Sequence, residues 1–262
     1  MKKFMVIKNY LTKEEQKVWE YLKEKEIVDN ELVNQIFPEI NRNKRNKIIH
    51  NLYKKGYIQR ARKDLYYNPE LLDSFYTLAS EFKKGYVGLN SALRYHNLIR
   101  HEDFTIFIIT QGFQKKIELN GTRYAIQFVP PHNNFTGFIK RDRTYISTVE
   151  RTLFDCMIKP QFVGFSNITK AFYEASINKK INWQEFIKYF KLTKNNSLCQ
   201  RTGYILDLLK KYKRIKIPIF IFDYLLKRIK NPVKLIPLKI KSKFNKKWKI
   251  QDNLGKENII PW

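Results

Sequence analysis

Arginine, lysine and asparagine side chains crowd one short segment near the start of the chain, residues 40–63. No aspartate or glutamate lies among them. In the major groove of DNA, arginine reads O6 and N7 of guanine and asparagine reads N6 and N7 of adenine, while lysine pairs with phosphates. These residue types therefore predict a surface that recognises duplex DNA. The candidate DNA-binding residues are Arg42, Asn43, Lys44, Arg45, Asn46, Lys47, Arg60, Arg62 and Lys63.

Two short helices are predicted before this segment. Thr12 and Glu15 have the spacing of a capping box, in which the hydroxyl takes the backbone N–H of Glu15 and the carboxylate reaches back. This pair opens a helix that runs to about Lys25. Asp29 is the expected N-cap of the second helix, and Pro38 lies just past its end.

A third helix is predicted from about Asn41 to Lys55, where Gly56 supplies a left-handed stop. Its apolar residues recur at helical spacing and define an inward face, which turns Arg45 and Asn46 to solvent. The inward residues are Ile48, Ile49 and Leu52. The first two turns of this helix therefore carry the groups that would enter a major groove.

A hairpin follows, with strands on either side of a turn at residues 62–64, and Pro69 closes it. Its basic residues Arg60, Arg62 and Lys63 are placed for contact with the DNA backbone or the minor groove. Three helices and a hairpin with a basic third helix are the pattern of a winged helix-turn-helix. Such modules also dock proteins, so a protein-docking or RNA-binding module is the competing non-enzymatic interpretation.

The whole chain has 262 residues and a net charge of +27, with 43% hydrophobic and 15% aromatic residues. This length and apolar content favour two packed domains, and the charge favours a polyanionic partner. We expect a winged-helix DNA-binding domain over residues 1–76 and an α+β domain over 77–262, with a bridging helix at 77–84. The charge sum alone is weak evidence because lysine greatly outnumbers arginine, which is typical of an AT-rich genome.

The second part of the chain mixes strands and helices without a regular repeat, which predicts an α+β domain. Buried strands are expected at 104–110 and 123–129, and the Asn120-Gly121 pair predicts a tight turn before the latter. Ser147 and Glu150 suggest a capping box for the next helix.

The cysteine count and the apolar runs restrict the class of protein. Two cysteines make neither a disulfide framework nor a four-ligand zinc site, and Cys156 is expected to be buried on a helix. The apolar start is too short for a signal peptide, and the longest apolar run, 217–226, is interrupted by Pro218 and Asp223. We therefore expect a soluble, cytoplasmic protein with no membrane partner.

Catalytic groupings are weak in this sequence. The four histidines lack metal-ligand spacing, and no glycine-rich phosphate loop is present. Glu118 has no partner acid at strand spacing, and the other acids near the strands are Glu102, Asp103 and Asp142. The interpretation is therefore no enzyme, no cofactor and no metal site. A metal-dependent nuclease with a winged-helix targeting domain is kept as the alternative.

Four motifs in the second part resemble the AbiEi family of antitoxins, which regulate phage-defence toxin–antitoxin pairs. They are residues 86–98 with the strand after them, 145–155, 200–209 and 247–253. The resemblance implies a DNA-binding repressor of its own operon. Because two copies on related half-sites are the usual geometry of such repressors, we expect it to bind an inverted repeat in its own promoter. The resemblance also implies an antitoxin that counteracts a nucleotidyltransferase-type toxin without forming a stable complex with it.

The same motifs have plainer interpretations from the residues alone. Arg151 and Asp155 make an i,i+4 ion pair worth about 0.3–0.5 kcal/mol if exposed. Arg201 binds a phosphate or pairs with an acid, and Gly203 inside a helix indicates close packing. Lysines continue to accumulate from residue 210 to 249, which leaves open whether the second domain also binds DNA or RNA.

Overall fold

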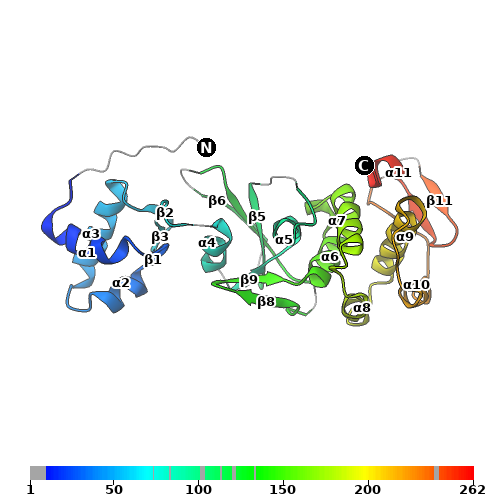
Figure 1. Ribbon diagram of the computed structural model, residues 1–262, viewed down its shortest axis with the longest axis horizontal. Coiled ribbons are helices and arrows are strands. Elements are labelled where there is room, and N and C mark those ends of the chain that lie inside the picture. The colour runs from blue at the N-terminus through cyan, green and yellow to red at the C-terminus, as the bar shows by residue number, and fades with distance from the viewer. Residues whose placement is uncertain are drawn as a thin grey trace. The chain divides into compact units, whose positions relative to one another are not determined.

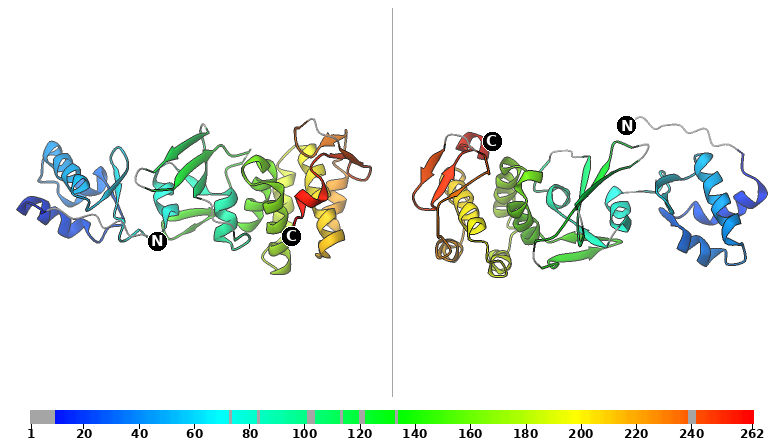
Figure 2. Two further views of the ribbon diagram at one scale, coloured as in Figure 1. Left: turned by 90° about the horizontal axis from the view of Figure 1, so that it is seen from above. Right: turned by 180° about the vertical axis from the view of Figure 1, so that it is seen from behind.

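The computed structural model describes residues 10–72, 74–82, 84–100, 104–112, 114–119, 122–132, 134–238 and 242–262. The chain divides into two compact units (Figures 1 and 2). The first contains residues up to Phe82 together with Ile117–Ala125, and the second contains Lys83–Lys116 and Ile126–Trp262. Helices and several sheets are mixed in the chain, which confirms the α+β class.

The predicted helices of the first unit are confirmed. They are α1 (Lys13–Leu22), α2 (Asn30–Ile36) and α3 (Arg42–Lys54). The capping box of Thr12 and Glu15 is formed in both directions, and Asp29 accepts from the backbone N–H of Leu32 at 2.7 Å. Gly56 ends the third helix with a φ of 80°. Local capping chemistry therefore sets where these helices begin and end.

A three-stranded antiparallel sheet completes this unit, with the strand order β1-β3-β2. The predicted hairpin is confirmed as β2 (Gln59–Arg62) and β3 (Leu65–Tyr67). The strand β1 (Ile27–Asp29) was not predicted, and it pairs with β3 so that Val28 faces Tyr66. The helices and the sheet share one core, whose fully buried members include Leu22, Leu52 and Ile58.

The helix α4 (Phe75–Phe82) groups with this first unit. Phe75 stacks on Tyr124 with 4.3 Å between ring centroids, and it also meets the ring of Tyr67 at 6.1 Å. These contacts connect the hairpin, α4 and the segment 117–125. The predicted turn at Asn120-Gly121 lies outside the described residues.

A six-stranded sheet follows, with the strand order β6-β7-β5-β4-β9-β8. Its strands are β4 (Gly85–Val87), β5 (Thr105–Thr110), β6 (Lys115–Glu118), β7 (Ala125–Val129), β8 (Phe138–Arg141) and β9 (Thr144–Ser147). The strand β4 pairs antiparallel with β5 and parallel with β9. Residues that are distant in sequence therefore build the centre of this sheet.

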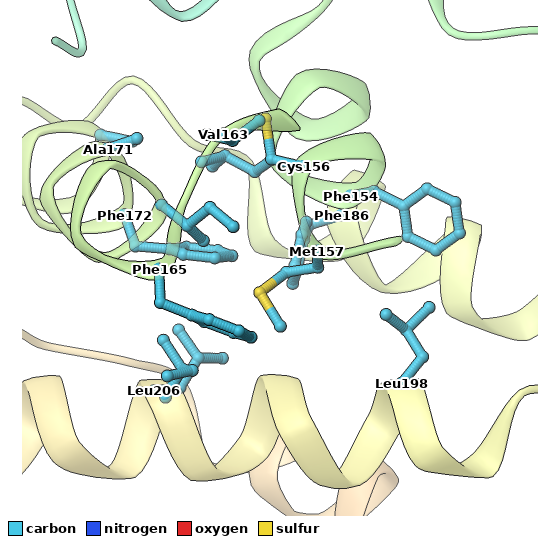
Figure 3. Close-up of a cluster of buried hydrophobic side chains, with 14 of the residues drawn as sticks. Phe154, Cys156, Met157, Val163, Phe165, Ala171, Phe172, Phe186, Leu198 and Leu206 are labelled. Carbon is cyan, nitrogen blue, oxygen red and sulfur yellow. The ribbon is translucent and has the colours of Figure 1, made fainter. Parts of the chain in front are cut away.

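Helices cover the sheet and build the main core of the second unit. They are α5 (Leu89–Tyr95), α6 (Val149–Ile158), the 3-10 turn η1 (Pro160–Phe162), α7 (Phe165–Ile177), α8 (Trp183–Lys191), α9 (Asn196–Lys213), α10 (Ile219–Leu226) and α11 (Lys256–Ile259). Figure 3 shows Met157, Phe165 and Leu206 directed into the space between α6, α7 and α9. Cys156 is fully buried in this core, as predicted.

The predicted capping box at the start of α6 is wrong. Thr148 is the N-cap, and its hydroxyl accepts from the backbone N–H of Arg151 at 3.3 Å. Ser147 belongs to β9 and is buried, where its hydroxyl hydrogen-bonds to Val87 and Thr152. The Glu150 carboxylate accepts instead from the backbone N–H of Asn182 at 2.8 Å. The strand runs one residue further than the sequence pattern indicated.

A small sheet near the end of the chain packs on α9. It consists of β10 (Val233–Lys234), β11 (Lys243–Asn245) and β12 (Ile250–Asp252), as the alternating tail predicted. A Cβ atom on Gly203 would lie 2.0 Å from the Trp248 ring, so only glycine fits there. Over the described ranges, every helix is too short or too polar to cross a membrane.

Candidate nucleic-acid interface

The helix α3 separates an apolar face from a polar one. Ile48, Ile49 and Leu52 are buried against the core, as predicted. Asn41 is the N-cap, and its side chain accepts from the backbone N–H of Lys44 at 2.9 Å. The opposite side of the helix is exposed along its length. Its exposed polar residues are Arg42, Asn43, Lys44, Asn46, Lys47, His50 and Lys54.

Arg45 departs from the expectation that it points freely to solvent. It is half-buried, and its Nη1 donates to the main-chain oxygen of Phe37 at 2.9 Å. Phe37 follows α2 directly, so this hydrogen bond ties the start of α3 to the end of α2. A guanidinium has five N–H donors, and the ones that remain are available to a ligand at the edge of the helix.

Lys44 is paired with an acid, which the sequence interpretation overlooked. Its ammonium forms a salt bridge with Glu14 of α1. The two side chains are 47% and 60% exposed, so the pair is a surface ion pair worth at most about 1 kcal/mol. The acid was missed because it lies 30 residues away in sequence. A phosphate can replace Glu14 at low cost.

A polar cleft of about 310 Å³ lies between α2 and α3. Arg42, Arg45 and Asn46 line it from α3, while Asn30, Glu31 and Asn34 line it from α2. Both helices therefore contribute asparagine side-chain amides to the wall of this cleft. Glu31 is the one carboxylate in this lining. The cleft therefore offers both hydrogen-bond donors and hydrogen-bond acceptors to a ligand, rather than positive charge alone.

The hairpin carries the other candidate residues. Its turn passes through Lys63 and Asp64, and Asp64 has a φ of 62°. Arg60 is half-buried, whereas Arg62 and Lys63 are exposed. The Nη1 of Arg62 donates to the main-chain oxygen of Lys63 at 3.0 Å, and its guanidinium lies 5.7 Å from the ring centre of Phe82. Arg62 therefore braces the turn, and Lys63 extends from its tip.

Aromatic rings hold the hairpin against α3. Tyr53 of α3 meets Tyr66 of β3 with 6.2 Å between ring centroids. Burial raises the pKa of the Tyr66 hydroxyl, and the nearby Arg60 opposes that rise. The helix and the hairpin are thus parts of one packed body, and the candidate residues on both belong to that body.

A buried carboxylate anchors α3 to α1. Glu15 is 3% exposed, and it accepts from Asn51 Nδ2 at 2.8 Å and from Lys55 Nζ at 2.6 Å. Burial raises the pKa of Glu15, but hydrogen bonds from Lys55, the Thr12 backbone and Asn51 outweigh it and lower the pKa to about 2. This anchor leaves the exposed face of α3 unobstructed.

The second unit holds a buried polar network around Arg151. Its Nε lies 3.0 Å from Asp155 and 3.2 Å from the hydroxyl of Tyr86. Burial alone would lower the pKa of Arg151, but Asp155 and Tyr86 raise it. Arg151 and Asp155 are 1% and 3% exposed, so the expected surface pair is instead an internal one. This network supports the fold and offers no surface to a ligand.

The remaining motif residues also have structural partners. Arg201 donates from Nε to the main-chain oxygen of Lys234 at 3.0 Å, rather than to an acid. His96 donates from Nε2 to the main-chain oxygen of Ser147 at 2.7 Å, and burial lowers the pKa of the imidazole. Within the described ranges, no group of three or more histidine, cysteine or acidic residues is arranged to hold a metal ion. His101, Glu102 and Asp103 lie outside those ranges.

The sequence matches no family model and no curated protein. Among solved structures, the chain is similar to that of the RV2827C protein from Mycobacterium tuberculosis, with a TM-score of 0.66. The identity is 13%, and the similarity covers 98% of this chain and 96% of the other. At this identity the likeness concerns the fold.

Proposed function

We propose that the first unit is a winged helix-turn-helix that binds duplex DNA, and that the chain is a transcriptional regulator. The exposed first half of α3 would lie in the major groove, and the β2–β3 hairpin would contact the flanking backbone. The observation that carries the proposal is the polar face of α3, where Arg42, Asn43, Asn46 and Lys47 are exposed opposite a buried apolar face.

The order of elements supports this assignment. A helix, a short strand, two helices and a hairpin follow one another, and the first strand closes the sheet beside β3 (Figure 1). In helix-turn-helix proteins the second helix of the motif reads base edges while the preceding helix lies across the backbone. Here those helices are α3 and α2, and Arg45 joins them through Phe37.

Electrostatics supports DNA over a neutral partner. Positive charge near a helix N-terminus opposes the helix dipole, at about 0.3–1 kcal/mol for each exposed charge. Arg42, Lys44, Arg45 and Lys47 all lie in the first two turns of α3. Lys44 and Arg45 offset this cost through Glu14 and Phe37, whereas Arg42 and Lys47 have no such partner among the described residues. A polyanionic ligand gains from each of the four charges.

We further propose that the second unit is an antitoxin domain of the AbiEi type, on the resemblance of its motifs. In that role the protein represses its own operon, as two copies on an inverted repeat, and counteracts a nucleotidyltransferase-type toxin without a stable complex. Co-expression with the product of the neighbouring gene tests this role. Growth restored by the full chain supports it, and growth arrest that persists contradicts it.

Fluorescence polarisation with labelled duplexes tests the DNA-binding proposal. The duplex from upstream of the gene is compared with a scrambled duplex and with a duplex RNA of the same sequence. We expect the upstream DNA to bind at least tenfold more tightly than either. Equal binding of RNA would favour the RNA-binding interpretation, and the same assay with Mg²⁺ or Mn²⁺ would reveal cleavage by a nuclease.

A further inference from the structure

A second cavity lies within the second unit. It has a volume of about 660 Å³. Its lining residues come from the end of α7, the start of α8, the last turns of α9 and the residues before α10. Figure 1 labels these four helices. Pockets for small molecules and cofactors commonly have volumes of about 300–1,000 Å³. The cavity is therefore large enough for a ligand of metabolite size.

Three lysines surround this cavity: Lys179, Lys210 and Lys216. All three are exposed, and no acidic residue contributes to the lining. Among the described ion pairs, none uses any of these ammonium groups. Lys210 also lies over the ring of Phe222, at 5.3 Å. The rim of the cavity thus presents three ammonium groups to an anionic ligand.

The floor of the same cavity is apolar. Ile215 and Ile217 are buried there, and the Trp183 indole and Ile181 contribute beside them. Trp183 meets Phe186 edge-on, with 5.8 Å between ring centroids, which holds its ring in place. An indole fixed in this way presents a flat surface on which another planar group can stack.

We propose that the cavity binds a nucleoside phosphate. The lysines would hold the phosphates, and the apolar floor with Trp183 would take the base. An inorganic anion would leave the apolar floor unused, and an uncharged aromatic ligand would leave three cations unused. The proposal concerns the second unit and does not rest on DNA binding by the first.

Isothermal titration calorimetry with the full chain tests the proposal. ATP, GTP, CTP and UTP are compared with the corresponding nucleosides and with tripolyphosphate, at a constant 0.15 M ionic strength. We expect one nucleotide to bind at one site per chain, at least tenfold more tightly than its nucleoside or tripolyphosphate. Failure of all four nucleotides to bind overturns the proposal, and so does equal binding of tripolyphosphate.

Matched variants separate the cavity from the general positive charge. Lys179→Glu and Lys216→Glu should each weaken nucleotide binding at least fivefold, and Lys243→Glu, on exposed β11, should not. Trp183→Phe should weaken the nucleotide but leave tripolyphosphate unchanged. Equal losses in Lys243→Glu and Lys216→Glu contradict the assignment. Circular dichroism melts that match the wild type establish that each variant is folded.

Discussion

The Arg45 guanidinium donates a hydrogen bond to the main-chain oxygen of Phe37, at 2.9 Å, and so fixes the proposed recognition helix to the helix before it. The residue predicted to read bases therefore also has a structural partner. If substitution of Arg45 weakens DNA binding, the cause is either a lost base contact or a less stable fold. Stability must therefore be measured alongside affinity.

Arg45→Ala should lower both stability and DNA affinity. A hydrogen bond that involves a charged group contributes about 1.5–3 kcal/mol, so the free energy of unfolding should fall by up to that amount. Urea denaturation of the first unit measures this change. Arg42→Ala serves as the control, since Arg42 is exposed, and should leave stability within about 0.5 kcal/mol. An Arg45→Ala protein as stable as the wild type would show that the bond to Phe37 contributes little.

Asn46→Ala and Lys63→Ala should weaken DNA binding in different ways. Asn46 is exposed in the polar cleft, and its loss should cost about 1–3 kcal/mol on the preferred sequence while scrambled DNA is unaffected. Lys63 lies at the hairpin turn, and its loss should weaken every sequence alike. Polarisation titrations on both duplexes measure the two effects. Lys191→Ala on α8 is the control, and identical behaviour of Asn46→Ala and wild type would exclude base reading by Asn46.

Acid should weaken the first unit through Glu15. Its pKa is lowered to about 2 in the folded protein from an ordinary value of 4.5. The carboxylate therefore stabilises the fold fully above pH 4.5, and this contribution is lost as the pH falls from 4.5 towards 2. Glu15→Gln should lose about 1.5–3 kcal/mol at neutral pH and show a flatter acid dependence. Denaturation between pH 3 and 7 measures both, and parallel curves for the two proteins would contradict the role of Glu15.

Asp155→Ala should destabilise the second unit strongly. It removes one partner of a buried ion pair and leaves the charge of Arg151 uncompensated, which costs about 3–5 kcal/mol. Lys188→Ala breaks an exposed pair with Glu185 and should cost less than about 1 kcal/mol. Thermal melts of the two variants give the comparison. A loss of similar size in both would place Asp155 in a far more hydrated environment than the structure has.

Local signals in the sequence account for the helices of the first unit. Thr12, Asp29 and Gly56 act through neighbouring backbone groups, so their effects are visible in a short window of sequence. The strand β1 escaped prediction because its three residues become a strand only by pairing with β3, about 40 positions later. The one-residue error at Ser147 has the same origin, since Val87 and Thr152 hold it in β9.

Burial and distant pairing explain what the sequence did not reveal about the sites. The spacing of Arg151 and Asp155 was evident, but their enclosure by Tyr86 and Tyr189 required the fold. The Lys44–Glu14 pair joins different helices and has no local pattern. The lysine-rimmed cavity combines residues 176–183 with 210–218, and no motif marks either segment. The apolar run at 217–226 became α10, preceded by Pro218 as its N-cap.

The dependence of DNA affinity on salt tests the central proposal most directly. If each copy contacts about six phosphates through α3 and the hairpin, log K for the upstream duplex should fall against log salt with a slope of about −5 per copy. Lys47→Ala should make that slope shallower by about one, while Lys191→Ala leaves it unchanged. A slope near zero, or the same slope in Lys47→Ala as in the wild type, would contradict a DNA contact by α3.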